Sequence, residues 1–151
     1  MAEAARPLGA EVVCGPAMGG IILAQWTGHH LGLPAVYAEK APEGGMALRR
    51  GYDALVRGRR VLVVEDVVNT GGSLADTIHA VRAAGGTVAG AVALCNRGGV
   101  TAADLDVPAL HSLLELSLDS WAADECPLCR RGAPVNTSVG KGREFLARRG
   151  A

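Results

Sequence analysis

Residues 61–73, with the sequence VLVVEDVVNTGGS, constrain the fold more than any other part of the chain. Four consecutive apolar residues open this stretch, which is typical of a strand buried on both faces of a parallel sheet. The acids Glu65 and Asp66 follow immediately, and a Gly-rich turn then leads into a helical pattern. A buried strand that passes through acids into a helix predicts an α/β fold with its polar chemistry at one edge of the sheet.

Apolar strand patterns alternate with helical patterns along most of the chain. The sequence predicts strands at residues 12–14, 35–38, 61–64, 88–95 and 111–116 and helices at residues 21–31 and 74–84. Ser73 is expected to cap the second helix, with Asp76 completing a weak capping box. Residues 40–60 are expected to form a long loop with part of a hairpin. The alternation predicts a three-layer α/β/α fold with a mainly parallel central sheet.

Length and composition favour a single globular core. The 151 residues predict one core domain at residues 1–123 and a polar, weakly structured tail at residues 124–151. The formal net charge is zero and aromatic residues make up 3% of the chain, which argues against a nucleic-acid-binding surface. No apolar run approaches the ~18 residues of a membrane span, and the N-terminus lacks the apolar core of a signal peptide. We therefore expect a cytoplasmic protein with reduced cysteines and with neither nucleic acid nor membrane as a partner.

The segment Thr-Gly-Gly-Ser at residues 70–73 has the properties of a phosphate-binding loop. Its small residues let backbone N–H groups approach an anion closely, Thr70 and Ser73 add hydroxyl donors, and the helix N-terminus adds partial positive charge. Glu65 and Asp66 would repel phosphate, but they accept hydrogen bonds from neutral hydroxyls and attract divalent cations. Acids beside a phosphate cradle therefore predict a ribose phosphate ligand, with its diol on the acids.

Two other phosphate-binding motifs do not fit this stretch. The P-loop requires Lys-Ser/Thr after its last Gly, and the dinucleotide fingerprint requires GxGxxG; the chain contains neither. The alternative is an ordinary strand-to-helix turn with solvent-facing acids, which explains the paired acids poorly. Residues 15–20 and 96–99 also leave the carboxyl ends of predicted parallel strands, so we expect these loops and residues 65–73 to converge on one ligand site.

The motif VLVVEDVVNTGGS resembles the signature of type I phosphoribosyltransferases, which bind 5-phosphoribosyl-1-pyrophosphate (PRPP). The resemblance implies that the acids hold the ribose hydroxyls and that residues 70–73 hold the 5-phosphate. The PRPP-binding residues that it implies are Lys40, Glu65, Asp66, Val67, Val68, Asn69, Thr70, Gly71, Gly72 and Ser73. The earlier loop GPAMGG resembles the family's pyrophosphate loop, which would comprise Pro16, Ala17, Met18, Gly19 and Gly20.

Further features resemble orotate phosphoribosyltransferases in particular. Lys40 follows the second predicted strand, where that family places a basic residue on the pyrophosphate, and the resemblance implies that Lys40 and Asp66 are catalytic. Thr70 and Arg97 would bind orotate, with the Arg97 guanidinium on its carboxylate, a pairing that the forked donor geometry suits. The alternatives are a surface lysine at residue 40 and a solvated arginine at the strand end.

The same resemblance implies an enzyme that transfers the phosphoribosyl group from PRPP to orotate, giving orotidine 5'-phosphate and pyrophosphate in pyrimidine (UMP) biosynthesis. It implies Mg²⁺ as cofactor, and a homodimer because the family's mobile loop reaches into a neighbouring subunit's site. Residues 43–45 and 48–51 resemble that loop, which is short here, so Arg49 and Arg50 would partly replace its additional Lys and His. The N-terminal hood segment of the family is expected to be missing.

Other interpretations remain open from the sequence. A purine or uracil phosphoribosyltransferase of the same fold is one, although Arg97 argues against it. A non-catalytic, PRPP-binding regulatory or truncated protein is another, which a missing hood would favour. Cys126 and Cys129 have the spacing of half a zinc knuckle and are candidate zinc ligands, within one chain or shared between two copies.

Overall fold

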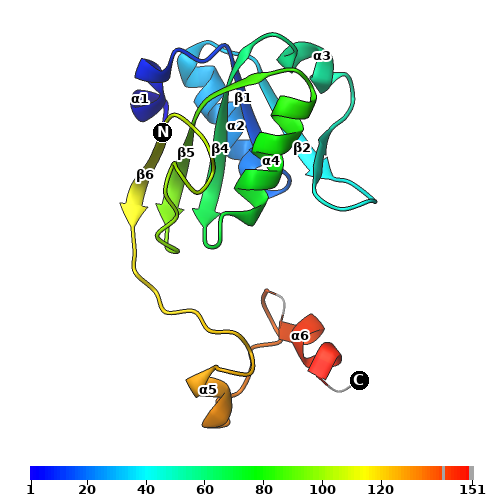
Figure 1. Ribbon diagram of the computed structural model, residues 1–151, viewed down its shortest axis with the longest axis vertical. Helices are drawn as coiled ribbons and strands as arrows, with labels where there is room; N and C mark the ends of the chain where they lie inside the picture. Colours follow the sequence, from blue (N-terminus) through cyan, green and yellow to red (C-terminus); the bar gives the residue numbers. More distant parts are fainter. Residues whose placement is uncertain (141, 150–151) are drawn as a thin grey trace. The chain divides into compact units, whose positions relative to one another are not determined.

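A six-stranded sheet organises residues 1–118, with the strand order β3-β2-β1-β4-β5-β6 (Figure 1). The computed structural model describes residues 1–140 and 142–149. The strands are β1 (Val12–Pro16), β2 (Ala35–Lys40), β3 (Met46–Leu48), β4 (Arg60–Val68), β5 (Thr87–Asn96) and β6 (Leu110–Glu115). The helices are α1 (Ala2–Ala5), η1 (Arg6–Leu8), α2 (Gly19–Leu31), α3 (Tyr52–Val56), α4 (Gly72–Ala83), α5 (Pro127–Arg130) and α6 (Gly142–Arg149). Residues 119–151 form a second unit, and the domain boundary after residue 123 stays a prediction.

The sheet is parallel except for β3, which runs antiparallel to β2. The chain passes from β1 through α2 to β2 on one side and from β4 through α4 to β5 on the other. The strand order therefore reverses between β1 and β4. In open α/β sheets, ligands bind in the crevice at the carboxyl ends of the two strands that flank such a reversal. The topology confirms the predicted mainly parallel α/β fold.

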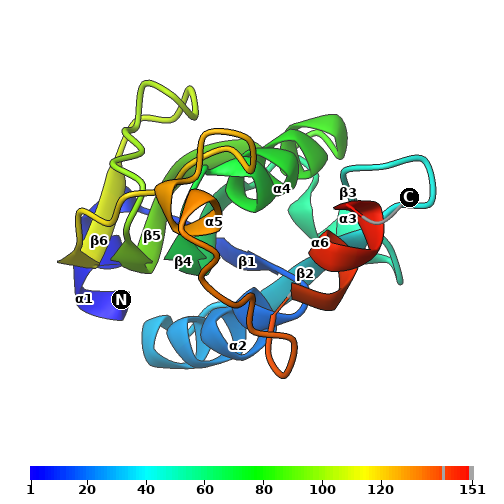
Figure 2. The same ribbon diagram turned by 90° about the horizontal axis from the view of Figure 1, so that it is seen from below.

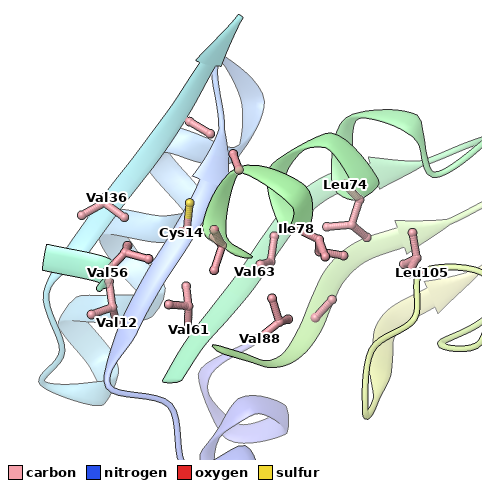
Figure 3. Packing of buried hydrophobic residues seen from close by; sticks show 14 of the residues in the cluster. Val12, Cys14, Val36, Val56, Val61, Val63, Leu74, Ile78, Val88 and Leu105 are labelled. Carbon is pink, nitrogen blue, oxygen red and sulfur yellow. The ribbon is translucent and has the colours of Figure 1, made fainter. Parts of the chain in front are cut away.

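Helices cover both faces of the sheet, with α4 on one side and α2 on the other (Figure 2). The alternation of side chains along β4 explains this arrangement, because all its central apolar residues are fully buried. Val61 and Val63 pack into the cluster that contains Leu74 of α4 (Figure 3), whereas Leu62 and Val64 pack into the cluster on the α2 side. A strand buried on both faces, as the apolar run predicted, thus forms the centre of a three-layer fold.

β4 continues beyond the predicted strand end at residue 64. It extends to Val68, so Glu65 and Asp66 lie within the strand instead of following it. The reason is that β5 pairs with β4 along this whole length, from Arg60 to Val68. Hydrogen bonding to β5 thus keeps Glu65 and Asp66 within the strand, although the hydrophobic pattern alone places them in a loop.

α4 begins differently from the prediction. Its N-cap is Gly71, whose φ of 80° is a left-handed conformation that glycine adopts without steric cost. Ser73 already lies in the first turn, where its carbonyl accepts a hydrogen bond from the Thr77 hydroxyl at 2.8 Å. The prediction that Ser73 caps this helix is therefore wrong, because the glycine turn starts the helix two residues earlier.

The stretch predicted as a long loop, residues 40–60, contains more regular structure than expected. β3 pairs with β2, so the anticipated hairpin is present, and α3 follows it. Val56 is fully buried in the cluster on the α4 side and anchors α3 to the core. Five residues are too few for a helical period to stand out in the sequence, so α3 was missed.

The second unit contains two short helices where the sequence predicted weak structure at best. α5 has four residues and α6 has eight. None of the helices within residues 1–140 and 142–149 has the length and apolar character that crossing a bilayer requires.

Replacing Gly86 by Ala should destabilise the core. An added Cβ would lie 2.6 Å from Val56 Cγ1 and 3.0 Å from Val81 Cγ1, and both valines are fully buried. Overpacking of this kind costs about 1–3 kcal/mol, so the urea midpoint of unfolding should fall. In the control Gly72→Ala, the added Cβ meets only the Thr70 hydroxyl oxygen, at 3.7 Å, and the midpoint should not fall. Equal midpoints for the two variants would contradict the described packing of α3 on α4.

Candidate functional site

The reversal of strand order brings two loops together at one edge of the sheet (Figure 1). β1 leads through residues 17–18 into α2, and β4 leads through residues 69–71 into α4. Both helices therefore begin at this edge. Helix N-termini carry free backbone N–H groups and partial positive charge, so this edge of the sheet is suited to an anionic ligand.

A cavity of about 90 Å³ lies at the end of β4, lined by Glu65 and residues 67–74. It is larger than a single water requires. No side chain caps α4, and its first turn contains no acidic residue. Thr70, Ser73 and the first turn of α4 thus line a space whose residues suit a phosphate, since this turn has free backbone N–H groups and both side chains carry hydroxyls. The structure brings residues 67–73, all predicted from the sequence as a PRPP-binding segment, to this one cavity.

The two acids of β4 differ in exposure. The Glu65 side chain is buried, whereas Asp66 is half-buried. Glu65 Oε1 accepts a hydrogen bond from the Asp66 backbone N–H at 3.0 Å, and Asp66 Oδ1 accepts one from the Val67 N–H at 2.6 Å. Burial is the main reason that the pKa of Glu65 rises from 4.5 to about 7, and the neighbouring Asp66 carboxyl raises it further, against the hydrogen bond from the Asp66 backbone. Glu65 therefore exchanges its proton near neutral pH.

The loop after β1 lies directly against Asp66. A Cβ added to Gly19 would overlap the Asp66 carboxylate, so a larger residue here would require the carboxylate to turn aside. A Cβ on Gly15 would likewise overlap the Gly20 backbone. The Ala17 backbone N–H donates to the Ala38 carbonyl of β2 at 2.7 Å. The predicted pyrophosphate loop, from Pro16 at the end of β1 to Gly20 in α2, is thus fixed to the strands on both sides.

Lys40 is the last residue of β2 and its side chain is exposed. β2 extends two residues beyond the end of β1, because Ala38 pairs with Pro16, so Lys40 lies at the carboxyl edge of the sheet. Arg49 and Arg50 were expected partly to replace the Lys and His of the family's mobile loop. In the structure they pair instead with Glu39, at 4.0 Å and 3.2 Å. In the described state, these two guanidiniums are held by the acid that precedes Lys40.

Arg97 lies beside the loop after β4. Its backbone N–H donates to the Val68 carbonyl at 2.9 Å, and its Nε donates to Asn69 Oδ1 at 3.4 Å. A Cβ on Gly98 would overlap the Asn69 backbone, so the two loops are in direct contact. The predicted orotate-binding pair, Arg97 and Thr70, therefore lies on two touching loops.

Asn96 begins the loop that was expected to reach the ligand site, but the sequence analysis gave its side chain no role. It is 4% exposed, its Nδ2 donates to the Val100 carbonyl at 2.8 Å, and its Oδ1 accepts from the Val100 N–H at 3.3 Å. These bonds close the turn that carries Arg97. A polar residue at the end of an apolar strand is the available signal, but its turn-closing role requires knowledge of the loop conformation.

The Cys126 and Cys129 pair begins α5. Cys126 is the N-cap, and its Sγ accepts a hydrogen bond from the Cys129 backbone N–H at 3.4 Å, which is the main reason that the pKa of the Cys126 thiol is lowered. Within residues 1–140 and 142–149, no group of three or more His, Cys, Asp or Glu side chains is arranged to hold a metal ion. The structure thus gives this motif a capping role and no further zinc ligands within the described chain.

Glu65→Gln should flatten the pH dependence of stability. Because the pKa of Glu65 is raised from 4.5 to about 7 in the folded chain, its contribution to stability is fully present below about pH 4.5 and is lost as the pH rises through about 7. Thermal melts should therefore show wild type losing stability across this window relative to the Gln variant. The exposed Glu43, changed to Gln, serves as control and should follow wild type. Parallel curves for wild type and Glu65→Gln would contradict the raised pKa.

A family profile and a related enzyme match most of the chain. The profile of the phosphoribosyl transferase domain matches residues 7–125. An orotate phosphoribosyltransferase from Pelotomaculum thermopropionicum is 47% identical over 127 residues, which cover 84% of this chain and 65% of that protein. The chain thus spans about two thirds of the length of this relative.

Solved structures share the fold. Orotate phosphoribosyltransferase from Mycobacterium tuberculosis, in complex with PRPP, has a TM-score of 0.62 at 30% identity, covering 76% of this chain and 68% of that one. Adenine phosphoribosyltransferase from Thermoanaerobacter pseudethanolicus has a TM-score of 0.66 at 22% identity, covering 76% and 75%. Proteins named for different bases share the architecture, so the fold alone does not choose a base. With the domain profile matched over residues 7–125, the chain belongs to the phosphoribosyl transferase domain family.

Proposed function

We propose that this chain is the core of an orotate phosphoribosyltransferase, which transfers the 5-phosphoribosyl group from PRPP to orotate and releases pyrophosphate. The observation that carries this proposal is the contact of Arg97 with the loop that forms the phosphate cradle, because it puts a guanidinium beside a ribose-phosphate site. A planar fork of N–H donors suits the carboxylate of orotate. The names of the relatives support the same base, and because the chain spans about two thirds of such a relative, the activity stays a proposal.

PRPP would lie along the carboxyl edge of β1 and β4. The 5-phosphate would accept hydrogen bonds from the first turn of α4 and from Thr70 and Ser73, and the ribose hydroxyls would donate to Glu65 and Asp66. The pyrophosphate would face the backbone of residues 16–20 and the Lys40 ammonium. The contact of Gly19 with Asp66 supports this order, because it sets the two loops side by side.

Mg²⁺ fits the chemistry of this edge. It prefers oxygen ligands and is usually held by one or two carboxylates together with substrate phosphates. Asp66 is a half-exposed carboxylate beside the predicted pyrophosphate loop, and no three-residue metal cage exists in the described ranges, so the ion would arrive with its phosphate ligand. When bound, the ion would supply positive charge to the leaving pyrophosphate.

The reaction would need little covalent chemistry from the protein. A ring nitrogen of orotate gives up its proton to solvent and forms a bond to C1 of the ribose. The C1–O bond to pyrophosphate breaks with inversion, and pyrophosphate leaves with the bonding electrons. The residues of the chain position the two reactants and stabilise the charge that develops, with Lys40 on the leaving group and Arg97 on the base. The hairpin turn after Lys40 would exclude water from the reacting carbon. We further propose that the protein is a homodimer, as the resemblance implies, and that it is located in the cytoplasm.

Asp66→Asn should weaken PRPP binding without unfolding the chain. The amide oxygen can still accept from the Val67 N–H, but the charge that attracts hydroxyls and Mg²⁺ is lost. A charged hydrogen bond contributes about 1.5–3 kcal/mol, so the Kd measured by calorimetry should rise about tenfold to hundredfold. The control is Asp76→Asn, an exposed acid on α4. A loss of thermal stability as large as the loss of affinity would mean that Asp66 is structural.

Pyrophosphate release with PRPP, Mg²⁺ and orotate should be measurable, and Arg97→Gln should raise the KM for orotate about tenfold or more because it removes a charge-assisted contact. The Kd for PRPP should change little in this variant. Adenine and uracil are the comparison bases. Turnover with either of them but not with orotate would defeat the choice of base, and PRPP binding without turnover on any base would favour the non-catalytic alternative.

A further inference from the structure

The turn that follows β5 is closed by one buried side chain. The carboxamide of Asn96 bonds to both backbone groups of Val100, because Nδ2 donates to the carbonyl at 2.8 Å and Oδ1 accepts from the N–H at 3.3 Å. The Asn96 backbone is held as well, since it pairs with Val68 of β4 and with Glu115 of β6. Residues 96–100 therefore form a closed turn that is fixed to the sheet at its base. We call these residues the Asn96 turn.

Arg97 lies on the Asn96 turn and reaches the loop after β4. Its Nε donates to Asn69 Oδ1 at 3.4 Å, and within residues 1–140 and 142–149 its guanidinium has no other hydrogen-bond or salt-bridge partner. The two terminal nitrogens, Nη1 and Nη2, are therefore free to bind a ligand. They form the end of the guanidinium fork, which can donate two parallel hydrogen bonds to one carboxylate. The place of this free end depends on the turn that carries it.

The other end of the Asn96 turn lies against the predicted phosphate cradle. A Cβ added to Gly71 would lie 3.3 Å from Val100 Cγ1 and 3.5 Å from Val100 Cγ2, so the valine side chain is close to the Gly71 backbone. Gly71 is the N-cap of α4 and lines the cavity at the end of β4. One short turn thus approaches both the predicted base-binding arginine and the backbone that begins the cradle.

We propose that Asn96 is a positioning residue for phosphoribosyl transfer, because the turn that it closes places Arg97 for the orotate carboxylate and Val100 against the phosphate cradle. This inference rests on the proposed function and extends it to a side chain that need not touch either substrate. Asn96 acts through the residues at the two ends of its turn, so its removal should weaken the binding of both substrates while the sheet stays folded.

A carboxamide is suited to this role because it donates and accepts at the same time. The Val100 carbonyl needs a donor and the Val100 N–H needs an acceptor, and Asn96 supplies both from one side chain. An apolar side chain of similar shape would leave both backbone groups without these partners, at a position where Asn96 is 4% exposed. The turn would then have to open toward water, and Arg97 would lose its fixed position.

The KM for orotate at saturating PRPP separates positioning from a purely structural role. Asn96→Leu keeps the approximate shape of the side chain but removes both bonds to Val100, so the KM should rise about tenfold while kcat changes less than about threefold. In the Arg97→Gln background, the same substitution should raise the KM less than about twofold, because the guanidinium that Asn96 positions is already absent. A purely structural residue would raise the KM by the same factor in both backgrounds.

The Kd for PRPP, measured by calorimetry without a base, is a second readout that does not depend on the choice of base. It should rise about threefold in Asn96→Leu with or without Arg97→Gln, because the contact of Val100 with Gly71 does not pass through Arg97. If wild type does not turn over orotate, the proposed base is wrong, and this Kd still decides the role of Asn96. An unchanged Kd would then overturn that role.

The matched control is Thr77→Val, which removes another buried hydrogen bond, from the Thr77 hydroxyl to the Ser73 carbonyl on α4. It should lower the melting temperature but leave the KM for orotate within about twofold of wild type. Asn96→Asp keeps the acceptor for the Val100 N–H and should stay within about threefold of the wild-type KM. If Asn96→Leu does not fold, Asn96→Ser replaces it in the same comparisons. A wild-type KM in the folded variant, or equal increases in the two backgrounds, would overturn the proposal.

Discussion

The close contact of Gly19 with the Asp66 carboxylate joins the two halves of the site, and the rest of the structure positions this contact. β1 and β4 are adjacent only because the strand order reverses between them. Gly15 and Gly20 then let the loop after β1 fold back onto its own strand. A side chain at Gly15 would meet the Gly20 backbone, and one at Gly20 would meet Pro16 and the Gly15 backbone, so either would force the loop to shift. The two-sided burial of the central strands thus serves to hold two backbone segments close enough to share one ligand.

The sequence predicted the parts of this structure that depend on local pattern. The strand β4 and the helix α4 were both predicted correctly. A strand buried on both faces leaves a continuous apolar run, and a helix buried on one face leaves a helical periodicity, so both can be recognised in the sequence. The start of α4 was predicted wrongly. Whether Gly71 or Ser73 is the N-cap depends on the backbone conformation, for which the residue types give only a preference.

Contacts between distant segments were beyond local reasoning. The bond from Arg97 to Asn69 and the pairing of Arg50 with Glu39 join residues 28 and 11 positions apart. Topology decides which strand ends meet, so a convergence of loops at the carboxyl edge could be expected, while the partner of each side chain could not. The glycines illustrate the difference. Their number predicted close backbone approach, but not that Gly19 faces an acid.

The burial of Glu65 has a consequence for the charge of the site. Its pKa of about 7 means that the Glu65 carboxyl is only partly ionised near neutral pH, although it is an acid. A phosphate-rich anion approaching the edge of β4 would therefore meet less repulsion from Glu65 than a fully ionised carboxylate exerts. Hydroxyl donors placed on Glu65 favour its ionised form, so occupancy of the site and release of one proton to solvent become linked quantities.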